Sequence, residues 1–242
     1  YGASIVGTAG AGTIAVSTSD FSIEADSANA FIVYYENTSI MARKASSYTG
    51  TGFSWGAATT VFIGGPPPGY NYPAIARDAS NKIFVVARNE PVSNYIYSAK
   101  RAVNANDITS WEAEVSIDGS SVNSNKFGTV VPLAGGDMYA VWIDGTAIEG
   151  KKYTSGTGWD ASPTAIATGV TGLENNVQMV SNTTADEAYL VYIDSSNNVV
   201  FRRYIDGTGW QTPVTLDSNA GNDYPTISIN TANNDLYVFW IR

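Results

Sequence analysis

Hydrophobic and polar residues follow a pattern along this chain that recurs about every 50 residues. In each repeat, a polar turn residue precedes a short apolar and aromatic segment, which ends at a charged residue. These segments begin at positions 29, 81, 137, 187 and 235 and read NAFIVYYEN, NKIFVVARN, DMYAVWIDG, EAYLVYIDS and DLYVFWIR. Further β-branched and aromatic segments surround them, separated by turns rich in Gly, Asn, Asp and Ser. Four short strands repeated at this period predict a β-propeller.

The repeats predict the number of blades. Four complete blades are expected, and the last repeat supplies only two strands before the sequence ends. Residues 1–17 contain two short apolar stretches that can complete this last blade. We therefore expect one all-β domain over residues 1–242, a five-bladed β-propeller of four-stranded antiparallel blades, with the ring closed by N- and C-terminal strands sharing one blade. The alternative is an open fragment of a longer propeller. The expected blades are 21–65, 70–119, 123–169, 173–219, and the shared blade of 1–17 with 222–242.

Composition narrows the chemistry. The chain contains no cysteine and no histidine, which excludes disulfides, thiolate chemistry and imidazole catalysis. Any metal site would use oxygen ligands and suit Ca²⁺ or Mg²⁺, although no cofactor is indicated. The net charge of −9 argues against a nucleic-acid partner. The basic pairs are expected to be solvated strand charges that discourage edge pairing. They are Arg43–Lys44, Lys100–Arg101, Lys151–Lys152 and Arg202–Arg203.

The sequence also predicts where the protein is found. No apolar run approaches the roughly 20 residues of a membrane span. A composition rich in Ser, Thr, Asn, Gly and Tyr with few Lys is typical of exported proteins, and the first residue, Tyr1, is not Met. We therefore expect an extracellular or cell-surface protein in its mature form.

Two repeated motifs carry a family resemblance. The motif YP-x-I occurs at Tyr72–Ile75 and Tyr224–Ile227, and the turn sequence DGTGW at Asp206–Trp210 has a relative at Ser155–Trp159. These blades resemble those of sialidase-like propellers with BNR-type repeats. Their aromatic pattern between the third and fourth strands is similar to that of propeller lectins, including fucose-binding ones. A further resemblance, to five-bladed arabinanase-like glycosidases, implies carboxylates on the inner strands. The candidates for that role are Glu24, Asp26 and Asp78.

Three sets of residues are candidates for ligand binding. Aromatic residues that open the fourth strand could stack on a sugar or pack between blades: Trp55, Trp111, Trp159 and Trp210. Charged residues that end the second strand could bind hydroxyl groups or serve as turn residues: Glu36, Asp144 and Asp194, aligned with Arg88 and Arg242. Polar loop residues suit recognition of polyols: Asn71, Tyr72, Asn175, Asp223 and Tyr224. A further aligned set is expected to pack against the adjacent blade: Tyr34, Val86, Trp142, Tyr192 and Trp240.

The leading hypothesis is a non-catalytic, lectin-like propeller whose partner is a glycan or a cell-surface polysaccharide. No residue is assigned a catalytic role. One alternative is a structural module that binds neighbouring subunits in a cell-surface, fibre or virion assembly. The other is a glycoside hydrolase with a pair of carboxylates at the mouth of the channel.

Overall fold

The computed structural model describes residues 21–26, 29–48, 53–65, 69–90, 96–118, 127–171 and 176–242. Within these ranges all regular structure is β, apart from one short 3-10 turn at Ala134–Gly136. The all-β prediction is therefore confirmed. Among the described residues, no helix has the length and apolar character needed to cross a bilayer.

The strands form five antiparallel sheets in chain order. The first sheet contains β1 (Phe21–Ala25), β2 (Ala30–Glu36), β3 (Ser39–Tyr48), β4 (Phe53–Trp55) and β5 (Thr59–Phe62). The second contains β6 (Gly69–Arg77), β7 (Ile83–Glu90), β8 (Ile96–Arg101) and β9 (Val115–Ser116). The third contains β10 (Gly128–Pro132), β11 (Met138–Asp144), β12 (Ala147–Thr154), β13 (Gly158–Trp159) and β14 (Thr164–Thr168). The fourth contains β15 (Val177–Asn182), β16 (Glu187–Ile193), β17 (Val199–Ile205), β18 (Gly209–Trp210) and β19 (Val214–Asp217), and the fifth β20 (Asp223–Asn230) and β21 (Asp235–Ile241).

The fourth strand differs from the prediction, because it is split in two. In the first, third and fourth sheets, two short segments pair in turn with the same third strand. In the fourth sheet, β18 and β19 both pair with β17, and the register shifts between Val199 and Val200. Pro213 lies between the two segments and has no N–H to donate to a ladder. One continuous fourth strand is therefore not formed there.

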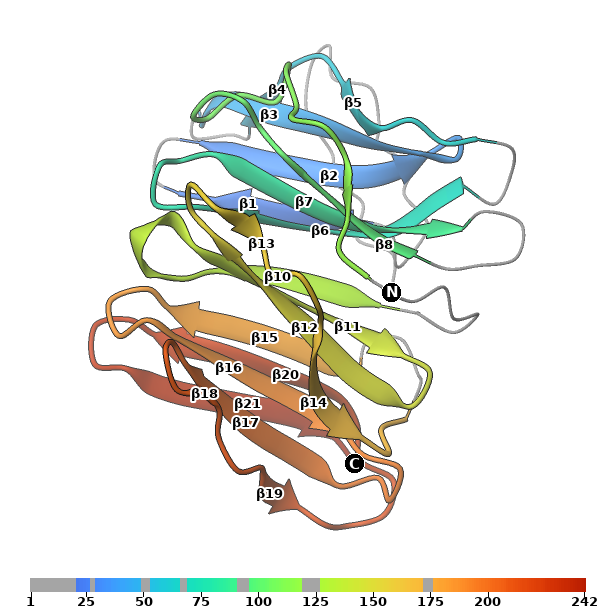
Figure 1. Cartoon of the computed structure of the whole chain (residues 1–242), viewed down its shortest axis with the longest axis vertical. Helices are drawn as coiled ribbons and strands as arrows, with labels where there is room; N and C mark the ends of the chain where they lie inside the picture. Colours follow the sequence, from blue (N-terminus) through green and yellow to red (C-terminus); the bar gives the residue numbers. More distant parts are fainter. Residues whose placement is uncertain are drawn as a thin grey trace.

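Adjacent sheets pack face to face and enclose the apolar core between them. Figure 1 shows the first sheet at the top, the second and third sheets below it, and the overlapping strands of the fourth and fifth sheets in the lower part. The core between the second and third sheets contains the fully buried Phe84, Tyr97 and Trp142. The first 20 residues lie outside the described residues. The closing blade that they were expected to share, and the count of five complete blades, therefore stay predictions.

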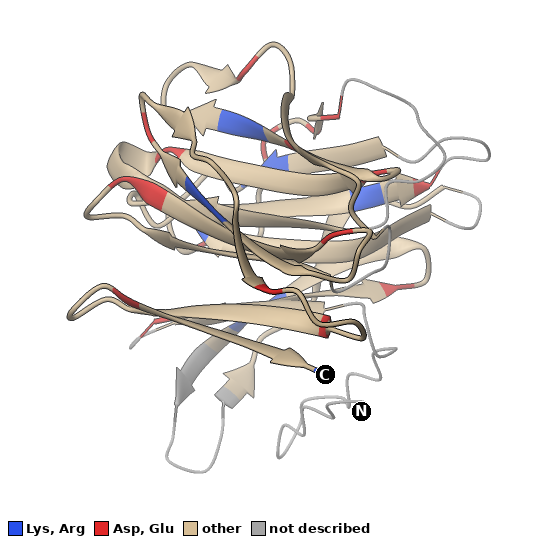
Figure 2. Ribbon diagram, turned by 90° about the horizontal axis from the view of Figure 1, so that it is seen from below, with Lys and Arg blue, Asp and Glu red and all other residues tan. Residues whose placement is uncertain are grey.

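A repeated pair fixes the register within each of the first four sheets. An aromatic residue of the second strand lies directly opposite a basic residue of the third. These pairs are Phe31–Lys44, Phe84–Arg101, Tyr139–Lys152 and Tyr189–Arg203. The expectation of solvated bases is wrong for Lys151, which is only 6% exposed. Figure 2 shows several Lys and Arg residues within strands, while many Asp and Glu residues lie near strand ends and in turns.

These pairs also correct the sequence alignment of the second sheet. In the third sheet, Trp142 follows the paired aromatic residue Tyr139 by three positions. In the second sheet, the residue three positions after the paired Phe84 is Ala87. Ala87 packs in the core shared with the first sheet, whereas Val86 packs in the core shared with the third. The predicted alignment of Val86 with Trp142 is therefore wrong by one residue, and so is that of Arg88 with Asp144. A slip of one residue in a strand moves each side chain to the other face.

The fourth and fifth sheets are also joined by an amide pair. The Nδ2 atom of Asn182 donates to Oδ1 of Asn234 at 2.8 Å. The Oδ1 atom of Asn182 accepts a hydrogen bond from the backbone N–H of Thr184 at 3.0 Å. Asn182 is 5% exposed, so both side-chain atoms are used in a buried setting where unpaired polar groups are costly.

Candidate functional site

A cavity of about 490 Å³ opens between the second and third sheets. Strand β8 of the second sheet lines one side, and strand β12 of the third sheet lines the other. The turn after β12 and the first residue beyond β13, Asp160, form the rim. We refer to this cavity as the inter-sheet pocket. Its volume falls within the range of small-molecule sites in proteins.

Three aromatic side chains form one wall of the inter-sheet pocket. The ring centroids of Phe84 and Tyr153 lie 4.9 Å apart, and those of Tyr153 and Trp159 lie 5.5 Å apart, both edge to face. Trp159 also meets Phe84 edge to face at 6.4 Å. These contacts fix the orientation of Trp159, which is half-buried and exposes part of its surface to the pocket.

Charged groups surround the aromatic wall. The Arg101 guanidinium lies 5.3 Å from the Phe84 ring centroid and 5.5 Å from that of Tyr153. It donates to Asp78 at 2.8 Å and to Glu112 at 3.3 Å. Burial raises the pKa of the Tyr153 hydroxyl above its usual value, so this group stays neutral at physiological pH.

The turn after β12 explains how Trp159 reaches its position. Gly156 and Gly158 have φ values of +80° and +106°, which residues other than glycine rarely adopt. The Thr157 N–H donates to the Thr154 carbonyl at 3.0 Å and closes the turn. As a result, Trp159 pairs directly with Tyr153. The same hairpin recurs in the fourth sheet, where Trp210 pairs with Tyr204.

The four predicted tryptophans have different surroundings in the structure. Trp159 lines the inter-sheet pocket. Trp210 donates from Nε1 to the Tyr139 hydroxyl of the third sheet at 2.9 Å. Trp111 packs against the core between the first two sheets, and Trp55 packs beside Ile32 and Tyr34 of its own sheet. Trp111, Trp210 and Trp55 thus make packing contacts in the described structure, and their part in sugar binding stays a prediction.

The three acidic residues that end the second strand have different surroundings. Asp194 caps its own turn, because its carboxylate accepts the N–H groups of Ser196 and Asn198 at 2.8 and 2.9 Å. Glu36 is exposed beside a turn with positive φ at Asn37. Asp144 instead lies in a group of acidic side chains.

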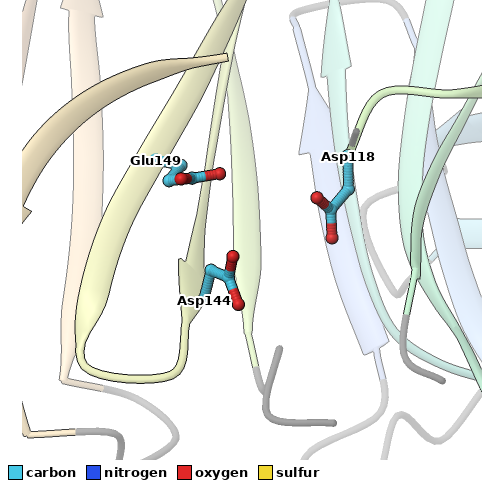
Figure 3. A group of neighbouring side chains, drawn as sticks. All are labelled: Asp118, Asp144 and Glu149. Carbon is cyan, nitrogen blue, oxygen red and sulfur yellow. The ribbon is translucent and has the colours of Figure 1, made fainter. Parts of the chain in front are cut away.

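That acidic group joins two sheets. Asp144 and Glu149 come from the ends of β11 and β12, and Asp118 comes from the segment after β9, facing them from the second sheet (Figure 3). One carboxylate oxygen from each residue lies within 4.8 Å of one from each of the others. Burial raises the pKa of Glu149, and the charges of Asp144 and Asp118 raise it further. Asp118 and Glu149 were not predicted, although the short turn after Asp144 sets Glu149 opposite Trp142.

The predicted loop residues cluster at two matching bulges. Tyr72 and Tyr224 each precede a proline, and their φ values are +51° and +48°. Positive φ is strained for a residue of this size. The Tyr72 ring lies 4.3 Å from the Arg88 guanidinium, and Asn71 beside it is half-buried. Tyr224 is 53% exposed, the neighbouring Asp223 carboxylate accepts the Tyr224 N–H at 2.9 Å, and Asn175 lies outside the described residues.

The three carboxylates proposed for hydrolysis are held by arginines. Asp26 pairs with Arg77, which also lies 3.9 Å from Glu24. Asp78 is 3% exposed and accepts the backbone N–H groups of Ser80 and Lys82, besides its bond to Arg101. Asp78 therefore stabilises a turn and is not presented to an open cleft.

Solved structures with a similar fold include two lectins and a GH43 protein. The lectin BP39L from Burkholderia pseudomallei is 10% identical, with a TM-score of 0.66 over 91% of this chain and 66% of the lectin. The Aleuria aurantia lectin, described as a six-bladed β-propeller with a novel fucose recognition mode, is 13% identical, with a TM-score of 0.59 over 92% and 70%. The GH43 protein BlXynB from Bacillus licheniformis is 11% identical, with a TM-score of 0.53 over 91% and 48%.

These similarities define the fold class. At identities of 10 to 13%, they show that the chain has a β-propeller fold, and they leave its ligand open. The chain spans just under two thirds of the length of the Burkholderia lectin. No family model and no curated protein matches the sequence.

Proposed function

We propose that this protein is a non-catalytic, extracellular sugar-binding propeller and that the inter-sheet pocket is its binding site. The observation that carries the proposal is the aromatic wall of Phe84, Tyr153 and Trp159 beside charged hydrogen-bonding groups. The Trp159 ring offers a flat apolar surface, and the C–H face of a sugar stacks on such surfaces. The sugar-binding neighbours in fold agree with this proposal without establishing it.

Polar groups around the pocket suit a neutral polyol. Arg101 and Lys151 can donate to hydroxyl oxygens, and the exposed carboxylates of Glu112 and Asp160 can accept from hydroxyl hydrogens. Because Arg101 and Glu112 are held by existing hydrogen bonds, these two groups need little reorganisation on binding. A single site of this kind has an affinity near the millimolar range, about −4 kcal/mol.

A glycan array with the purified chain tests the proposal. Binding should occur, and Asp160→Asn and Trp159→Ala should each weaken it at least tenfold. Trp210→Ala is the matched control, because it removes the same residue of the same hairpin outside the inter-sheet pocket. A blank array would overturn the proposal. Equal losses in Trp159→Ala and Trp210→Ala would assign the effect to folding, and Asp160→Asn would then decide.

The closed, five-bladed ring is the second part of the proposal. The fifth sheet has two described strands, and its outer face carries Tyr237, Phe239 and Ile241 at 46 to 61% exposure. Strands from residues 1–17 would complete this sheet beside β21, and closure would cover the apolar face with the first sheet. Deletion of residues 1–17 should then turn a monomer into an associating species in light scattering. Association of the intact chain would instead favour the structural module.

A glycoside hydrolase needs two carboxyl groups about 5–5.5 Å or about 6.5–9.5 Å apart in an open cleft. In the described residues, the group of Asp118, Asp144 and Glu149 has close carboxylates, but Asp118 is only 5% exposed between the sheets. This burial argues against Asp118 as a member of such a pair, and Asp144 and Glu149 are half-buried, so we prefer binding to hydrolysis. Release of reducing sugar from polysaccharides by the purified chain would reverse that preference.

A further inference from the structure

We infer that Asp118, Asp144 and Glu149 form a site for one divalent cation of the size of Ca²⁺. The site lies at the interface of the second and third sheets. It uses the end of β11 and the start of β12, whereas the inter-sheet pocket uses the opposite end of β12. The inference therefore stands independently of sugar binding.

The spacing of the carboxylates suits calcium. Three oxygens, one from each carboxylate, lie within 4.8 Å of one another. Ca²⁺ binds oxygen ligands at 2.3–2.6 Å, so two ligands on opposite sides of the ion are about 4.6–5.2 Å apart. One ion can therefore contact all three side chains. Asp144 and Glu149 are half-buried, which leaves a route from solvent, and water can complete the shell of six to eight oxygens.

A buried indole provides independent support. Trp142 lies on the same face of β11 as Asp144 and directly opposite Glu149. It is 0% exposed, and its Nε1 atom has no hydrogen-bond acceptor in the described part of the chain. A buried N–H group without an acceptor is costly. A water or carboxylate oxygen ordered by the cation would supply that acceptor.

The interface between the fourth and fifth sheets shows the partners of a carboxylate, Asp217, at the position that corresponds to Asp118. Asp217 follows Trp210 by seven residues, as Asp118 follows Trp111. Asp217 accepts the indole N–H of Trp240 at 3.1 Å and a guanidinium N–H of Arg242 at 2.6 Å. The indole that corresponds to Trp142 is thus directed toward the carboxylate that corresponds to Asp118, beside a positive charge.

At the interface of the second and third sheets, the position of that positive charge is occupied by an acid. Asp144 aligns with Arg242, and Glu149 adds a third carboxylate. Two basic residues lie on the strand faces that form this interface. Lys151 is two residues from Glu149 on β12, and Arg88 on β7 pairs with Glu90. A bound dication would supply the charge that Arg242 supplies at the other interface.

Calcium titration of the intact, chelator-treated chain tests the site. Calorimetry should show one saturable site, and Asp144→Asn and Glu149→Gln should each weaken Ca²⁺ binding at least tenfold. Asp194→Asn is the matched control, because Asp194 ends the corresponding strand of the fourth sheet and caps its own turn. It should bind Ca²⁺ like the native chain. If circular dichroism shows that Glu149→Gln is unfolded, Asp144→Asn decides.

Terbium luminescence gives a second readout that locates the ion. Tb³⁺ bound beside Trp142 should emit on indole excitation, and Trp142→Phe should remove most of that emission. Trp240→Phe should leave the emission intact. Three results would each overturn the inference: no binding at millimolar Ca²⁺, an equal loss in Asp194→Asn and Asp144→Asn, or undiminished emission in Trp142→Phe.

Discussion

The interface between the second and third sheets and the interface between the fourth and fifth sheets place related residues in different electrostatic settings. Between the fourth and fifth sheets, Asp217 accepts hydrogen bonds from both Trp240 and Arg242, so acid, indole and base are all paired. Between the second and third sheets, Asp118 and Trp142 take the corresponding positions, and Asp144 replaces the base. The difference teaches that packing positions are repeated in this fold while charge is free to change. New binding sites can therefore arise without altering the core.

Removal of the two indoles should produce the largest contrast. Trp142 is fully buried, whereas Trp240 is half-buried. Trp142→Ala should lower the free energy of unfolding by about 3–5 kcal/mol, because it leaves a large cavity. Trp240→Ala should cost less. Urea unfolding followed by fluorescence measures both, and the comparison fails if Trp240→Ala proves the more damaging change.

A charge substitution should convert one interface into the other, with an intermediate effect. Asp144→Arg places a guanidinium where Arg242 stands at the second interface, near Asp118 and Glu149. In calcium-free buffer it should raise the free energy of unfolding by up to about 1 kcal/mol, as a partly exposed ion pair does. Asp194→Arg should instead destabilise, because Asp194 caps its turn. Destabilisation by both substitutions would contradict the proposed equivalence.

Acid should act most weakly, through Asp217. The Arg242 guanidinium, followed by the N–H of Asn219 and the indole of Trp240, lowers the pKa of Asp217 from 3.8 to about 2. Since the pKa is lower in the folded state, the stabilisation is complete above about pH 4 and is lost as the pH falls toward 2. Urea midpoints of the native chain and Arg242→Ala should therefore differ at pH 5 and converge near pH 2. A constant difference would exclude this pair as the cause.

Strands were predictable from this sequence because short apolar and aromatic segments, separated by turn residues, recur in each repeat. The alignment of the second sheet was not, because two residues separate the turn residue Asn81 from Phe84, whereas only one separates Asp137 from Tyr139. Sequence comparison alone could not tell whether Val86 or Ala87 faces the first sheet. The paired residues Phe84 and Arg101 settle that question only once the register is known.

The candidate sites were predictable in part. Trp159 was found from its repeated hairpin, and Asp144 from its place at a strand end. Asp118 was missed because it comes from another sheet, and face-to-face packing between sheets leaves no periodic signal in the chain. Glu149 had a signal, since a two-residue turn after Asp144 fixes which residues of β11 and β12 are opposite each other.

The buried amide of Asn182 has a consequence for the production of this protein. Asn182, Thr183 and Thr184 form an acceptor tripeptide for N-linked glycans. A glycan added during synthesis would occupy the Nδ2 atom that donates to Asn234, and it would hold the fourth and fifth sheets apart. Hosts that glycosylate secreted proteins are therefore unsuitable for the native sequence. Thr184→Ala removes the acceptor at an exposed residue and keeps the amide pair intact.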